Sequence, residues 1–133
     1  MLIKKEQLPQ VALKEMNEIH FEEVDMINKL YDTAESGDYE KTRELLNEFI
    51  EHIEDHFSFE EDLMEQNEFF AYPMHKMEHD RVIRDLYELK KKFEETRDTK
   101  TVSHFLKEGF LPWLINHLNT MDAVTASFLS PGF

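Results

Sequence analysis

Residues 39–66 read YEKTRELLNEFIEHIEDHFSFEEDLMEQ, an uninterrupted stretch without glycine or proline. Apolar side chains recur in it at three- and four-residue spacing, which is the pattern of an amphipathic α-helix. The stretch therefore predicts a helix from Tyr39 to Gln66, with an apolar stripe made of Leu46, Phe49, Ile53 and Leu63. His56 and Glu60 occupy positions on the same stripe, so we expect both polar side chains to point inward.

The sequence on either side of this helix predicts three more. They run from about Pro9 to Ala34, from about Met74 to Thr96 and from about Thr101 to Phe128. Pro112 lies inside the last helix, where it predicts a kink or a restart near Trp113. Four amphipathic helices joined by short links predict an all-α fold, an up-down-up-down four-helix bundle, and we expect one domain over residues 1–133.

Composition excludes several classes of function. The chain has 29 acidic and 15 basic residues and a net charge of -14, which argues against a nucleic-acid partner. It has no cysteine, which excludes disulfides, iron–sulfur clusters and thiolate zinc sites. No apolar run approaches the roughly 18 residues of a membrane span, and the charged N-terminus offers no secretion signal. We therefore expect no membrane association and a cytoplasmic location.

The apolar stripes of the other helices also contain polar residues. His20 fills a stripe position in the first helix, His75 and His79 extend the stripe of the third, and His117 lies on that of the fourth among Phe110, Leu114, Met121, Val124 and Phe128. Asp122 lies just beside this last stripe. We expect these residues to point into the bundle together with His56 and Glu60, and the other 27 acidic side chains to lie on the surface.

Two further histidines fall outside this set. His104 is off the stripe and is expected at the surface. His52 lies one turn before His56 at the edge of the stripe. We expect it to be exposed, with a place beside the inward-facing set as the alternative.

A metal centre explains five histidines and two carboxylates in one core. A single buried histidine is commonly an ordinary hydrogen-bonded core residue, but two buried carboxylates cost several kcal/mol each unless a cation or donor compensates them. Seven ligands exceed the four of a structural zinc site. Imidazoles combined with carboxylates that can bridge favour a pair of iron ions over manganese or zinc. The chain contains neither Glu-x-x-His nor His-Glu-x-x-His, which argues against a ferritin-like di-iron site and a zinc protease.

These motifs resemble the hemerythrin family, including its single-domain bacterial members. The matching elements are His20, the run His56-Phe57-Ser58-Phe59-Glu60-Glu61 with Met64, the pair His75-x-x-x-His79 after Tyr72-Pro73, and Trp113-Leu114-x-x-His117-x-x-x-x-Asp122. The resemblance covers nearly the whole chain. It implies two non-haem iron ions bridged by an oxo or hydroxo group.

The resemblance also implies how the ligands divide. One iron would take His75, His79 and His117, the other His20 and His56, and Glu60 and Asp122 would bridge them. O2 would bind at the open position of the iron with two histidines. Phe57, Trp113 and Leu114 would line the O2 pocket, although ordinary core packing explains these three side chains equally well.

The function that follows is reversible O2 binding, for oxygen storage, delivery or scavenging. The alternatives are an O2 or redox sensor and a di-iron enzyme acting on peroxide or nitric oxide. No side chain outside the ligand set presents itself as an acid or base, so we expect an oxygen-binding protein rather than an enzyme. The sequence leaves any protein partner open.

Overall fold

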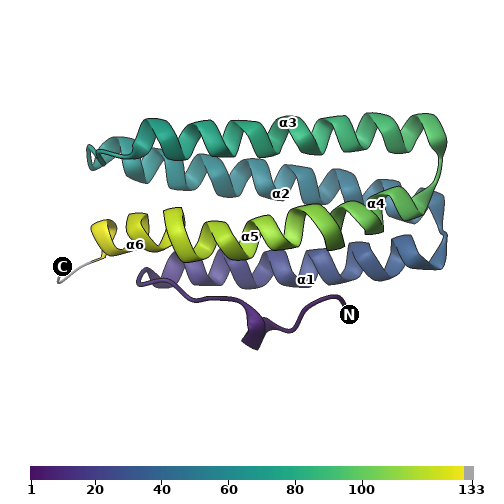
Figure 1. Ribbon diagram of the computed structural model, residues 1–133, viewed down its shortest axis with the longest axis horizontal. Helices are drawn as coiled ribbons and strands as arrows, with labels where there is room; N and C mark the ends of the chain where they lie inside the picture. The colour runs from purple at the N-terminus through teal and green to yellow at the C-terminus, as the bar shows by residue number, and fades with distance from the viewer. Residues whose placement is uncertain (131–133) are drawn as a thin grey trace.

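A computed structural model describes residues 1–130 of the chain, and the last three residues of the predicted domain lie outside this range. The described part is an up-down-up-down bundle of four long helices with no strands, as the sequence predicts. Figure 1 shows α3 and α2 above the last helix and α1. None of these helices combines the length and the apolar character that spanning a membrane requires.

The second helix, α2 (Tyr39–Gln66), has the predicted bounds. Its N-terminus is capped by Asp38, whose carboxylate accepts a hydrogen bond of 3.0 Å from the backbone N–H of Lys41. The preceding helix ends at Ser36 and is capped by Gly37, whose φ of 85° lies in the left-handed region that glycine adopts without strain. Helix α3 (Tyr72–Thr96) begins two residues before the predicted start, with Pro73 in its first turn.

Helix α1 (Lys14–Ser36) starts later than predicted. The sequence predicts helix from Pro9, but residues before Lys14 instead form a strap that runs antiparallel along α1 and contains one short 3-10 turn, Lys5–Gln7. Two asparagines of α1 hold the strap. Asn28 bonds the backbone of Leu2 and Ile3, and Asn17 bonds both the N–H and the carbonyl of Val11. These side chains satisfy backbone groups that a helix would otherwise have to satisfy, so the strap can stay extended.

The last long helix is continuous but irregular. It consists of α4 (Thr99–Phe105), a π-helical turn Leu106–Phe110, α5 (Leu111–His117), a second π-helical turn Leu118–Asp122, and α6 (Ala123–Leu129). Pro112 lies in the first turn of α5, directly after the first π turn. The α-helix therefore restarts at Leu111, near Trp113 as predicted, and the irregular turn itself lies just before Pro112.

The interior of the bundle divides along its length. One half is apolar, with Leu30, Phe49, Leu86, Phe93 and Leu106 all fully buried. The other half lies where α2 turns into α3, and polar side chains are buried there. Because neighbouring helices are antiparallel, the first half of α1 and α3 meets the second half of α2 and of the last helix at this end.

Candidate metal centre

Seven polar side chains meet in this second half of the interior. They come from all four long helices and are all at most 4% exposed. We refer to them as the histidine–carboxylate cluster, consisting of His20, His56, Glu60, His75, His79, His117 and Asp122. These are the seven residues that the sequence predicts to point inward, and the structure brings them together in two groups that could each hold a metal ion.

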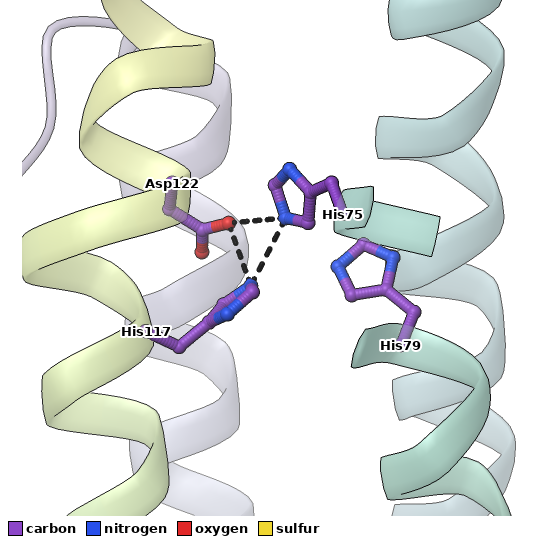
Figure 2. A group of neighbouring side chains, drawn as sticks. All are labelled: His75, His79, His117 and Asp122. Carbon is purple, nitrogen blue, oxygen red and sulfur yellow. Dashed lines mark hydrogen bonds and ion pairs between the residues drawn. The ribbon is translucent and has the colours of Figure 1, made fainter. Parts of the chain in front are cut away.

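The first group combines α3 with the end of α5. His75 and His79 lie one turn apart on α3 and so share a face. The Nε2 atoms of His75 and His117 are 3.0 Å apart, and each lies 3.0 Å from Oδ1 of Asp122. Figure 2 shows this triangle, with the ring of His79 beside it. Four donors from two helices thus converge around one point.

The second group combines α1 with α2. His56 and Glu60 are one turn apart, and Nε2 of His56 lies 2.6 Å from Oε2 of Glu60. Nε2 of His20 lies 3.6 Å from the same oxygen and 3.3 Å from Oδ2 of Asp122. This group has two imidazoles where the first has three.

Both carboxylates divide their oxygens between the two groups. Asp122 directs Oδ1 to His75 and His117 and Oδ2 to His20. Glu60 directs Oε2 to His56 and His20, and Oε1 lies 3.4 Å from Nε2 of His79. A carboxylate placed in this way can bind two cations at once, one through each oxygen.

The second π turn makes the spacing of His117 and Asp122 possible. Five residues of a regular α-helix turn the chain by about 500°, which would leave the two side chains roughly 140° apart. A π turn takes up about one extra residue, so residues five apart return to the same side. His117 and Asp122, at the two ends of this turn, are therefore both buried.

The same turn corrects the predicted stripe of the last helix. Regular spacing from His117 predicts Met121, Val124 and Phe128 in the core, but Val124 is 52% exposed and Phe128 is 38% exposed. The buried residues after the turn are Asp122, Thr125 and Ala126. The stripe is displaced because the π turn adds a residue that regular helical spacing does not count.

Unpartnered atoms at the centre fit cations. Buried atoms without a hydrogen-bond partner in the described chain include both ring nitrogens of His20, Nε2 of His79, Oε1 of Glu60 and both oxygens of Asp122. Leaving such groups buried without partners is costly. Imidazole nitrogens and carboxylate oxygens are together the donors that iron, zinc and manganese accept, so the residues present fit a metal centre.

Without metal, the cluster behaves as a set of buried ion pairs. Burial alone lowers the pKa of His20, but the nearby carboxylates of Asp122 and Glu60 outweigh it and raise the pKa to about 9. The pKa values of His56 and His79 are also raised, because nearby carboxylates overcome the effect of burial. Burial and mutual repulsion raise the pKa of Glu60, yet the surrounding histidines hold it well below its ordinary value, and those around Asp122 do the same there. Protons therefore supply positive charge where a metal ion would otherwise do so.

Outer hydrogen bonds orient three of the imidazoles. Nδ1 of His75 lies 2.9 Å from Oγ1 of Thr125, and Nδ1 of His79 lies 2.9 Å from Oε2 of Glu61. Nδ1 of His56 donates to the carboxylate of Glu23. Each bond holds the proton on Nδ1 and directs Nε2 into the cluster, as is usual for metal-binding histidines.

Glu23 is the residue of this centre that the sequence analysis missed. It is fully buried, so the expectation that the other 27 acidic side chains all lie on the surface is wrong. Glu23 follows His20 by three residues and precedes Ile27 by four, and this helical spacing could have located it. The prediction that His52 is exposed is also wrong, since it is half-buried with Nε2 3.9 Å from Oε1 of Glu23. His104 is exposed, as predicted.

Two of the three predicted pocket residues, Phe57 and Trp113, contact rings of the cluster, and the third is buried nearby on the last helix. Phe57 is stacked on the ring of His79, with centroids 3.8 Å apart and planes at 5°. Trp113 is stacked on His117 at 4.6 Å, and its indole N–H donates to Glu78. Leu114 is buried.

The carboxylate of Glu78 in turn accepts from the guanidinium of Arg81. Hydrogen bonds from Arg81 and Trp113 outweigh burial and lower the pKa of Glu78 to about 2. Glu78 therefore stays charged at neutral pH and keeps an acceptor in place for the indole.

Comparisons of the sequence and of the structure with known proteins lead to the same family. The sequence model of a family described as the hemerythrin HHE cation binding domain matches residues 11–129. A bacteriohemerythrin from Aquifex aeolicus is 42% identical over 129 residues, covering 97% of this chain and 98% of its own. One from Methylococcus capsulatus is 32% identical over 108 residues, covering 80% of this chain and 79% of its own. The crystal structure of a wild-type hemerythrin is similar with a TM-score of 0.82 at 27% identity, covering 98% of both chains.

Proposed function

Because this chain belongs to the hemerythrin family, a family of O2-binding di-iron proteins, we propose that it binds O2 reversibly at two non-haem iron ions and serves in oxygen storage, delivery or scavenging. The observation that carries the proposal is the division of the carboxylate oxygens. Asp122 and Glu60 each direct one oxygen to each histidine group, an arrangement that suits a pair of ions and that a single ion does not require.

The assignment of ligands follows the two groups. One ion would take His75, His79 and His117, and the other would take His20 and His56. Glu60 and Asp122 would each offer one oxygen to each ion, together with an oxo or hydroxo bridge. With two imidazoles instead of three, the second group would leave its ion room for a further ligand, and we assign O2 to that position.

When bound in the ferrous state, such an iron pair supplies electrons that O2 takes up on binding and returns on release. The protein residues control access and orientation. Phe57 lies against both histidine groups, with its ring centroid 5.3 Å from that of His56 and 3.8 Å from that of His79. Trp113 covers His117 of the three-histidine group, and Leu114 is buried one helical turn before His117. A dry, apolar wall limits the access of water and protons, which favours release of O2 over its further reduction.

The test is an oxygenation cycle on the purified protein. The protein is reduced without air, its iron is quantified, and O2 is admitted and then removed while the visible spectrum is recorded. We expect two irons per chain and an absorption band that appears with O2 and disappears without it. Fast, irreversible oxidation would favour the sensor or enzyme alternatives, and one colourless zinc per chain would refute the di-iron centre.

Two histidine variants give the matched control. His117→Ala removes a residue of the cluster and should abolish the band and lower the iron content. His104→Ala removes an exposed histidine and should change neither. Equal spectra for both variants would contradict the ligand assignment.

A further inference from the structure

Glu23 presents a buried carboxylate that the ligand assignment does not use. Its side chain is 0% exposed and lies one helical turn after His20 on α1. Its one hydrogen bond in the described chain joins it to Nδ1 of His56, on the side of the imidazole that faces away from Glu60. Its other oxygen, Oε2, has no partner there. Nε2 of His52 lies 3.9 Å from Oε1 of Glu23, beyond hydrogen-bond distance.

Such a placement is costly for a group that serves only packing. Taking a carboxylate out of water costs several kcal/mol unless hydrogen bonds and a positive charge compensate it. An apolar side chain of similar size would fill the same space without this cost. The one hydrogen bond of Glu23 is with an imidazole of the cluster, so its effect on the cluster is most direct at His56.

The groups that bond Nδ1 of His79 and His75 carry less negative charge than Glu23 does, once their surroundings are counted. Glu61 bonds Nδ1 of His79, but its side chain is 17% exposed and lies 3.7 Å from Nζ of Lys76, so water and a lysine offset its charge. Thr125, which bonds Nδ1 of His75, is neutral. Glu23 is therefore the one fully buried carboxylate among these outer contacts, and it lies beside the group that has only two imidazoles.

We propose that Glu23 is a positioning residue that strengthens His56 as a donor and thereby raises the affinity of the two-histidine group for its metal ion. The inference rests on the proposed dinuclear centre. A carboxylate that accepts a proton from Nδ1 increases the electron density at Nε2 and fixes the orientation of the ring. The three-histidine group has a third imidazole as a donor. Glu23 replaces part of that donor strength in the two-histidine group by acting through His56.

Stepwise titration with Co²⁺ tests this without iron or O2. Glu23→Gln keeps the shape and an acceptor oxygen but removes the charge, and it should lower the affinity of one of the two ions by about 10–100-fold. The other ion should keep its affinity within about threefold. The matched control, Glu22→Gln, removes an exposed carboxylate from the neighbouring position of α1 and should change neither affinity by more than about threefold.

A second readout separates donor strength from a merely structural role. In the zinc-loaded protein, the ¹H resonance of the His56 Nδ1–H should lie far downfield, as a strong hydrogen bond to a buried carboxylate requires. It should move upfield in Glu23→Gln and stay in place in Glu22→Gln. Glu23→Asp, which keeps the charge, should lose less affinity for Co²⁺ than Glu23→Gln.

Several results would overturn the inference. They are unchanged affinities in Glu23→Gln, equal losses at both ions, a stationary His56 resonance, or a greater loss in Glu23→Asp. A parent protein that binds only one Co²⁺ would overturn it together with the dinuclear centre. A parent that binds two ions with the expected Glu23 effect, but shows no reversible O2 spectrum when loaded with iron, would refute only the oxygen-binding function.

Discussion

Removing the metal should reverse the pH dependence of folding stability. In the metal-free protein, positive charge at the centre comes from protonated imidazoles, and His20 has a pKa of about 9 instead of its ordinary 6.5. A group whose pKa is raised by folding stabilises the folded state fully below pH 6.5 and loses this contribution as the pH rises through about 9. In the metal-loaded protein the same imidazoles must be neutral to bind, so stability should rise over this interval.

The size of the effect follows from the shift of His20. At about 1.4 kcal/mol for each pKa unit, a rise from 6.5 to about 9 corresponds to about 3 kcal/mol. His56 and His79 shift in the same direction and should add to the loss. A domain of this kind is commonly stable by only 5–15 kcal/mol, roughly, so the change is large. Glu60 and Asp122 act in the opposite sense, because their lowered pKa values make stability fall as the pH drops below about 4.5.

The assay is urea unfolding of chelator-treated protein at pH 6 and pH 9, followed by circular dichroism. The free energy of unfolding of the parent should fall by about 3 kcal/mol or more from pH 6 to pH 9. In His20→Gln this fall should be smaller by about 3 kcal/mol. His104→Gln, at an exposed position, should behave as the parent does. Metal-free stability that is flat from pH 6 to pH 9, or an equal loss in His20→Gln, would refute the picture of buried ion pairs.

Three further perturbations test other contacts. Phe57→Ala removes a buried ring stacked on His79 and should cost about 3–5 kcal/mol of unfolding free energy in urea; a loss below about 1 kcal/mol would show that the ring is not packed there. Asn28→Ala removes three hydrogen bonds to the strap, and should cost about 1–3 kcal/mol and speed its proteolysis; unchanged cleavage would contradict this role. Asp122→Ala removes a carboxylate shared by both groups and should reduce bound Co²⁺ below two per chain; two ions of unchanged affinity would count against a bridge.

The four-helix bundle could be predicted from the sequence because apolar spacing and capping residues mark most of its helices locally. Helix α2 contains neither glycine nor proline, and Asp38 caps its N-terminus. The bounds of α2 therefore follow from residues that are neighbours in the chain. The start of α1 cannot be predicted in this way. Side chains of α1 hold the residues before Lys14 instead: Asn17 bonds the backbone of Val11, and Asn28 bonds that of Leu2 and Ile3. No periodic pattern of apolar residues contains these contacts.

In the candidate site, too, some residues could be predicted from the sequence and others could not. Five imidazoles at helical spacing were found because histidine is conspicuous on an apolar stripe. Glu23 lies at an equivalent position but was counted with the many surface carboxylates, because sequence alone does not distinguish a buried acidic group from an exposed one. The position of Asp122 was predicted only as beside the stripe, since the π turn that brings it inward leaves no mark in the residue spacing itself.

The π turn at Leu118–Asp122 also limits how this centre could be transplanted. A designer who copies the seven side chains onto four ideal α-helices would find six positions that fit and one, Asp122, on the wrong side of its helix. The graft would have to bring the irregular turn with it, or move the aspartate to the position four residues after the histidine. The second choice would draw the carboxylate back by one residue along the helix axis. A graft that tests both constructions would show whether the centre depends on its seven side chains alone or also on the backbone that carries them.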